Sequence, residues 1–267
     1  IVAQAGGNAL YLEELTRAAL LGDDSAAPAT VIAMMQARIT RLPVRTRHVL
    51  HAASVFGPQF WRGGVAQLLG YEAHDAALLR ALGELHEQEL IVEQADSELG
   101  GDVQYAFRHV LVRDATYALL TDGARVSAHS AAARFLLGPH RDAARGQLVS
   151  ALDALDALPD DAINRRRRID LLLRLMDTSR SSDEPVLQQH RLRQAEVAVR
   201  QLMQDAPTAD LPRQQVMLNY WLGNSYYLSN QPTAALAHFR EVLKQDVTDV
   251  RMLSLPLGAM GRIGCAL

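Results

Sequence analysis

Apolar residues recur at spacings of three and four along most of the chain, which is the spacing of one face of an α-helix. The two clearest stripes are Ile32, Met35, Ile39 and Leu42, and Leu78, Leu82 and Leu85. Hydrophobic residues make up 49% of the 267 residues and aromatic residues only 5%, a balance that favours helix packing over a β-sandwich. We therefore expect a mainly α protein, and a chain of this length favours two folding units.

One stretch of the chain has β character instead. The apolar run "LIVEQA" (residues 90–95) is followed by the turn-forming segment "DSELGGD" and then by "VQYAF" (103–107), which alternates as a hairpin partner does. Three or four helices followed by a β-hairpin is the element order of a winged-helix domain. We expect a winged-helix-like regulatory domain with a small β-hairpin over residues 28–138.

Beyond residue 120 the pattern is helical to the end, and one segment matches the tetratricopeptide repeat. The matching residues, at the offsets of that repeat, are Leu222, Gly223, Tyr226, Ala235 and Phe239. The small residues Gly223 and Ala235 are expected to let two antiparallel helices approach closely. We expect tetratricopeptide-like antiparallel helical repeats, an α-solenoid, over residues 139–267. Because the last pair is incomplete at Leu267, we expect the repeats to be truncated at the C-terminus.

The segment "YAFRHVLVRDATYALL" (105–120) places several ionisable groups at a strand-to-helix junction. It could be a catalytic site, a nucleic-acid contact or a hinge that senses a ligand held elsewhere. Catalysis would need His109, Asp114 and Tyr117 together, but on a helix that begins near His109 the side chain of Asp114 is turned away. No nucleophile turn or zinc-ligand spacing stands out elsewhere, so we expect no catalytic residue and no metal ligand. The helical half is expected to pack through Leu111, Tyr117, Leu119 and Leu120.

Nucleic-acid binding is opposed by the charge of the helix that would read DNA. Residues 74–90 carry four carboxylates against one arginine, Arg80, and the whole chain has a net charge of −3. Such a helix would be repelled by phosphates. The densest basic cluster, Arg165 to Arg168, begins an amphipathic helix and is expected to be a solvated face or a docking point for an acidic partner. DNA is therefore not the expected partner of this segment.

Lysine is almost absent from the chain, and this excludes one common nucleotide site. Lys244 is the only lysine and has no glycine near it, so the Gly-Lys-Ser/Thr core of a phosphate-binding Walker loop is missing. We expect the chain itself to hold no cofactor, to bind ATP weakly if at all, and not to hydrolyse it. The single cysteine, Cys265, and the lack of a long apolar run favour a cytoplasmic protein without a membrane span.

Four segments occur in an order that resembles the STAND class of AAA-like signalling ATPases. They are "GGNALYLEEL", "ITRLPVRTRHVLHAASVFGPQF", "YAFRHVLVRDATYALL" and "ARVSAHSAAARFL". The likeness is greatest to the bacterial group in which an ATPase, a winged helix and tetratricopeptide repeats follow a serine/threonine kinase or an adenylate/guanylate cyclase domain, or precede a LuxR-type DNA-binding domain. It covers roughly residues 1–136 well and the repeats loosely.

The resemblance implies roles for particular residues. It places residues 1–27 at the end of the ATPase lid, where Gly7 and Asn8 match residues near the nucleotide, and it matches His109 to a histidine that approaches the phosphates. ATP or ADP with magnesium would be held by an upstream domain in cis. The implied function is signal transduction by a non-catalytic segment, in which the winged helix gates a nucleotide switch and the repeats bind a protein partner or signal ligand. The alternatives are a DNA-binding transcriptional regulator and a purely helical scaffold.

Overall fold

The computed structural model describes residues 12, 16, 31–138, 140–178, 185–244, 256–258 and 261. Backbone contacts divide the chain into unit 1 (Ile1–Phe135) and unit 2 (Leu136–Leu267). The described residues are mainly helical, as the apolar periodicity predicts. None of the described helices is long and apolar enough to cross a membrane. The predicted boundaries after residues 27 and 138 stay predictions, and the first predicted segment lies almost wholly outside the described residues.

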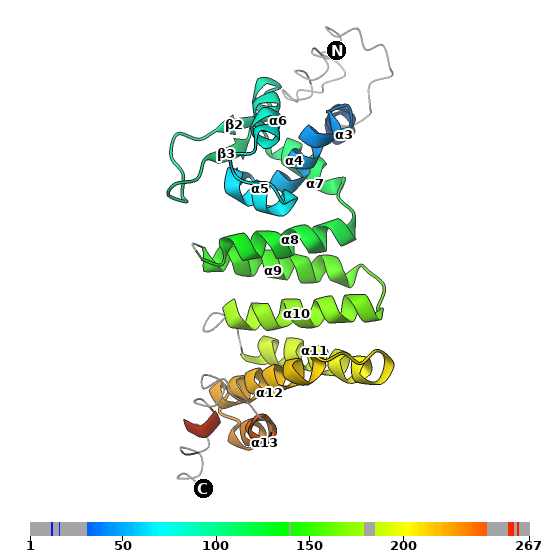
Figure 1. The fold of residues 1–267 in the computed structure, drawn as a ribbon, viewed down its shortest axis with the longest axis vertical. Coiled ribbons are helices and arrows are strands. Elements are labelled where there is room, and N and C mark those ends of the chain that lie inside the picture. The colour runs from blue at the N-terminus through cyan, green and yellow to red at the C-terminus, as the bar shows by residue number, and fades with distance from the viewer. Residues whose placement is uncertain are drawn as a thin grey trace. The chain divides into compact units, whose positions relative to one another are not determined.

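Unit 1 contains helices around one small sheet (Figure 1). Its elements in chain order are α3 (Val31–Thr40), α4 (Val44–Ser54), β1 (Gln59–Trp61), α5 (Arg62–Leu69), α6 (Ala76–Glu87), β2 (Ile91–Glu93), β3 (Gln104–Phe107), α7 (Val110–Ala118) and α8 (Asp122–Leu136). α8 ends one residue beyond the boundary between the units.

The sheet has three antiparallel strands in the order β1-β3-β2. β2 and β3 form the predicted hairpin, with Val92 opposite Ala106. The expectation of a hairpin alone is incomplete, because β1 pairs with the other edge of β3 and sets Phe60 opposite Tyr105. Their rings stack with centroids 5.6 Å apart. β1 is hidden in the sequence because it is only three residues long and follows Gly57 and Pro58, which are typical of a loop.

The core of unit 1 lies between the helices and this sheet. Leu78, Leu82 and Leu85 of α6 are buried, as their spacing predicts. On α3 the predicted stripe is partly wrong, because Ile32 is exposed and Met34 is buried instead. Ile32 lies in the first turn of the helix.

Two aspartate side chains accept hydrogen bonds from the first turns of helices α5 and α6. Asp75 accepts hydrogen bonds from the backbone N–H groups of Ala77 and Leu78 at distances of 2.7 and 3.2 Å, which caps α6. Asp102, from the loop between β2 and β3, accepts the N–H of Gly63 at 2.9 Å in the first turn of α5. A Cβ atom at residue 63 would lie 2.5 Å from the same carboxylate. A side chain at residue 63 would therefore displace the Asp102 carboxylate from this contact.

The helix that follows β3 packs through a different face from the one predicted. The buried residues of α7 are Val112, Ala115 and Thr116. The predicted Leu119 is 37% exposed, and it follows the last residue of the helix. The predicted Leu111, Tyr117 and Leu120 are only partly buried, because α7 packs against α3 and α4 through the side that carries Val112.

Unit 2 is a series of helices in which each packs on the one before it in the chain (Figure 1). They are α9 (Arg141–Asp156), α10 (Ala162–Thr178), α11 (Pro185–Asp205), α12 (Leu211–Leu228) and α13 (Pro232–Leu243).

Candidate functional site

Most ionisable groups at the junction between β3 and α7 have partners within unit 1. Arg108 pairs with Glu89 at 2.7 Å. Arg113 donates from Nε to the carbonyl oxygen of Ser54 at 3.0 Å, which ties α7 to the last turn of α4, and it also pairs with Asp114 at 3.0 Å. These charges therefore hold the junction together.

Tyr117 is fixed between two guanidinium groups. Arg113 and Arg125 lie over its ring, each 4.8 Å from the centroid. Its hydroxyl group lies 2.8 Å from Nε2 of the buried His129. Tyr117 and Asp114 thus have partners other than His109, and no hydrogen bond or ion pair among the described residues joins the three into an acid–base set.

His109 is the exception at this junction. Its backbone is extended, with φ −136° and ψ 138°, and it immediately precedes α7. The imidazole is half-buried, and its Nε2 atom is shielded from solvent without a hydrogen-bond partner among the described residues. Buried polar atoms are nearly always paired, so an unpaired one calls for an explanation such as an unfilled contact. Gly7 and Asn8, the other residues predicted near a nucleotide, lie outside the described residues.

The predicted repeat residues lie on helices α12 and α13, which pack against each other. Leu222, Ala235 and Phe239 are fully buried, and Tyr226 is nearly so. Gly223 lies directly under the Phe239 ring: a Cβ atom there would be 2.5 Å from Cδ1 of the ring. The close approach of the two helices therefore depends on glycine at residue 223.

A row of polar contacts that the sequence does not predict joins α11, α12 and α13. Nε of Arg193 on α11 donates to the Tyr226 hydroxyl group at 3.0 Å. The Tyr226 ring stacks on His238 with centroids 5.4 Å apart, and Nδ1 of His238 lies 3.0 Å from Oδ1 of Asn219.

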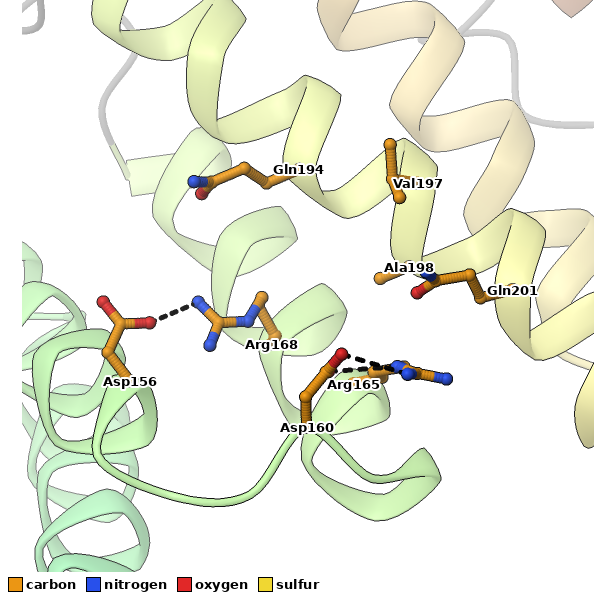
Figure 2. A pocket seen from close by; sticks show the side chains of 8 residues that line it. All are labelled: Asp156, Asp160, Arg165, Arg168, Gln194, Val197, Ala198 and Gln201. Atoms are coloured by element: carbon orange, nitrogen blue, oxygen red, sulfur yellow. Dashed lines mark hydrogen bonds and ion pairs between the residues drawn. The ribbon is translucent and has the colours of Figure 1, made fainter.

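The arginine run of α10 lines an open pocket within unit 2 (Figure 2). The pocket has a volume of about 430 Å³ and is lined by Asp156, Asp160, Arg165, Arg168, Gln194, Val197, Ala198 and Gln201. Figure 2 shows the side chains of α10 facing those of α11 across it, with Val197 and Ala198 on the α11 side. The lining has carboxylates, guanidinium groups and amides, and so offers both donors and acceptors to a polar ligand or peptide.

All four arginines of the run make contacts inside the chain. Arg165 binds Asp160 with two hydrogen bonds of 3.0 Å, and Arg168 binds Asp156 at 2.6 Å. Arg166 donates to the carbonyl oxygen of Ala206, and Arg167 to the Asn164 side chain. The Arg165 guanidinium group holds the pKa of the exposed Asp160 carboxyl below its ordinary value. The run is therefore held by local contacts, and Arg165 and Arg168 have their charge balanced by carboxylates of the chain.

No group of three or more His, Cys, Asp or Glu side chains that could hold a metal ion occurs among the described residues. Comparisons of the chain with protein-family models, with curated proteins and with solved structures found no match. The interpretation of His109, the repeat residues and the pocket therefore depends on their own geometry.

Replacing Gly223 with alanine should destabilise unit 2 by about 1–3 kcal/mol, because the new methyl group would overlap the buried Phe239 ring. The matched control is Gly146→Ala in α9, where the added Cβ has open space and should stabilise the helix by up to about 1 kcal/mol. Urea unfolding followed by Trp221 fluorescence, in a Trp61→Phe background, measures both. Equal effects of the two substitutions would contradict the close packing.

Unit 2 should lose stability as the pH falls from 7.5 to 5. Burial lowers the pKa of His238 below its ordinary value of 6.5, and Arg193 lowers it further against the opposing effect of Glu196. Below pH 6.5 the unfolded chain therefore binds a proton that the folded chain resists, so the free energy of unfolding falls. Urea unfolding at the two pH values should show a smaller fall in the free energy of unfolding for the His238→Gln variant than for the parent. The control variant His190→Gln, at an exposed position of α11, should show the same fall as the parent. An unchanged pH dependence in His238→Gln would refute this assignment.

Proposed function

We propose that this chain is a non-catalytic regulatory and interaction segment of a STAND-type ATP-dependent signalling protein. In this proposal unit 1 is a winged-helix module that gates a nucleotide switch, and unit 2 is a tetratricopeptide-like array that binds a protein partner or a signal ligand. ATP or ADP is held by an upstream domain in cis.

The observation that carries the proposal is the position of His109. The helices and strands before it run α4-β1-α5-α6-β2-β3, with the sheet order β1-β3-β2, which is the element order of a winged helix. His109 is the second residue after β3, and its shielded Nε2 atom has no partner among the described residues. A donor or acceptor left unpaired at that place supports a contact with a group outside this chain, such as a phosphate.

The packing of unit 2 supports the second half of the proposal. Each helix contacts its neighbours in the chain, and Gly223 under Phe239 supports the close approach typical of a tetratricopeptide pair. The pocket between α10 and α11 adds a surface with both charges and amides. Such a surface suits a protein or polar ligand better than a phosphate chain.

A DNA-binding regulator is the alternative, and the same element order favours it. The charges oppose it, because both parts of a winged helix that approach DNA are acidic here. α6 has Glu84 and Glu87 with Glu89 just beyond, and the loop between β2 and β3 has Asp96 and Glu98 exposed. Repulsion from phosphates would act on the helix and on the loop together.

The chain should therefore not retard a 20-base-pair duplex in a gel at low salt. A variant with Glu87→Lys and Glu98→Lys tests the cause, because it replaces carboxylates on the helix and on the loop and should increase non-specific binding. Retardation by the parent chain that weakens steeply as salt rises would favour the DNA-binding alternative.

Substitution of His109 by alanine in the full-length protein tests the switch. We expect faster release of bound ADP and altered output, because the contact between unit 1 and the nucleotide is lost, whereas His74→Ala on an exposed turn should change neither. Calorimetric titration of the isolated chain with ADP and ATP should detect no binding of micromolar affinity. The proposal fails if ADP retention and output are unchanged, or if the reading frame upstream of Ile1 encodes no Walker loop.

A further inference from the structure

Charge is segregated along unit 1. Residues 31–71 contain no aspartate or glutamate but have five arginines: Arg38, Arg41, Arg45, Arg47 and Arg62. Residues 72–108 contain nine carboxylates and only two arginines. Helices α3 and α4 therefore carry positive charge and are followed by an acidic segment.

The positive charge is concentrated where α3 turns into α4, at a surface that we call the α3–α4 corner. It consists of Arg41, Val44, Arg45, Arg47 and His48. All but Arg47 are exposed, and the Val44 side chain is 60% exposed. An aliphatic side chain surrounded by arginines is a composition typical of protein interfaces, where arginine is enriched and lysine is depleted.

Arg45 and Arg47 do not stabilise α4 through its helix dipole. Arg45 and Arg47 occupy the first turn of α4, where the positive end of the helix dipole disfavours cations. Arg47 donates to the carbonyl oxygen of Thr40 at 2.7 Å, and among the described residues neither arginine is paired with a carboxylate. On α10, by contrast, Arg165 and Arg168 pair with the chain's own aspartates. The corner thus keeps positive charge at a place where it works against the helix.

Among residues 31–135, no carboxylate pairs with Arg45 or Arg47 of this corner. Figure 1 shows the loop between β2 and β3 extending from a different side of the unit from α3. Glu84 of α6 does reach α4, but it accepts the hydroxyl hydrogen bond of Thr46. The charges of Arg45 and Arg47 are therefore available to an external carboxylate.

The surroundings of the corner favour a protein over a nucleic acid. A duplex extends well beyond a patch of this size and would carry its phosphates toward the acidic α6 and the acidic loop. A short acidic segment can pair with Arg45 and Arg47 without approaching the carboxylates of α6 and of the loop. The exposed Val44 also offers contact area that a phosphate backbone cannot use and an aliphatic side chain can.

We propose that the α3–α4 corner is a docking site for an acidic segment of another protein, with aspartate or glutamate side chains flanking an aliphatic one. The carboxylates pair with Arg45 and Arg47, and the aliphatic group covers Val44. This site goes beyond the proposed switch and does not require it, because none of its residues takes part in the contact assigned to His109.

The test uses a fluorescent 16-residue helical peptide with glutamates flanking leucines, and a matched peptide in which glutamine replaces every glutamate. Anisotropy titrations with the whole chain should show binding of the glutamate peptide that weakens as salt rises. Arg45→Glu should weaken it by about tenfold or more and Val44→Ser several-fold, on the usual scale of interface substitutions. Arg134→Glu, at an exposed site elsewhere in unit 1, should leave it unchanged.

Thermal unfolding of the same variants separates docking from folding. Arg45→Glu places a carboxylate in the first turn of α4, so its midpoint should stay the same or rise while peptide binding falls. A lower midpoint would overturn the argument, because it would make Arg45 a structural residue.

Four other results would also overturn the proposal. They are equal binding of the glutamine peptide, no binding of the glutamate peptide at millimolar concentration, tighter binding of a 20-base-pair duplex that depends on Arg45, and self-association of the chain in sedimentation that is lost in Arg45→Glu. The last two would assign the corner to nucleic acid or to a second copy. None of these results bears on ADP retention, so failure here is distinguishable from failure of the switch.

Discussion

The arrangement of unit 1 depends on β3 as the central strand of its sheet. β3 pairs with β2 on one edge and with β1 on the other, and Phe60 of β1 packs against Tyr105 and Phe107. The same strand leads directly into the junction where His109 lies. A substitution that displaced β3 would therefore disturb the sheet, the start of α7 and the candidate switch residue together.

Charged groups in this chain fall into two classes. Arg108, Arg113 and the arginines of α10 are matched with nearby carboxylates or carbonyl groups, and exposed pairs of this kind contribute only modestly to stability. Arg45 and the Nε2 atom of His109 have no such match among the described residues. Function is proposed for the second class because the fold leaves those groups without a role of their own.

The candidate sites were only partly predictable from the sequence. The motif residue His109 and the glycine under Phe239 could be selected because their spacing matches known patterns. The polar row of Arg193, Tyr226 and His238 could not, because its members come from three helices and no sequence spacing relates them. The corner of α3 and α4 was likewise missed. Its arginines are visible in the sequence, but only the structure separates them from the matched arginines of α10.

Local chemistry in the sequence was sufficient for the mainly helical class, the β2–β3 hairpin and the inward face of α6, because periodicity and turn residues act over a few neighbours. The tertiary structure decided the third strand, the inward face of α7 and the partners of each charge. β1 exists because β3 offers an unpaired edge, and α7 turns Val112 inward because it packs against α3 and α4. Such outcomes depend on contacts between segments that are distant in the chain, and a single sequence does not encode those contacts in any local pattern.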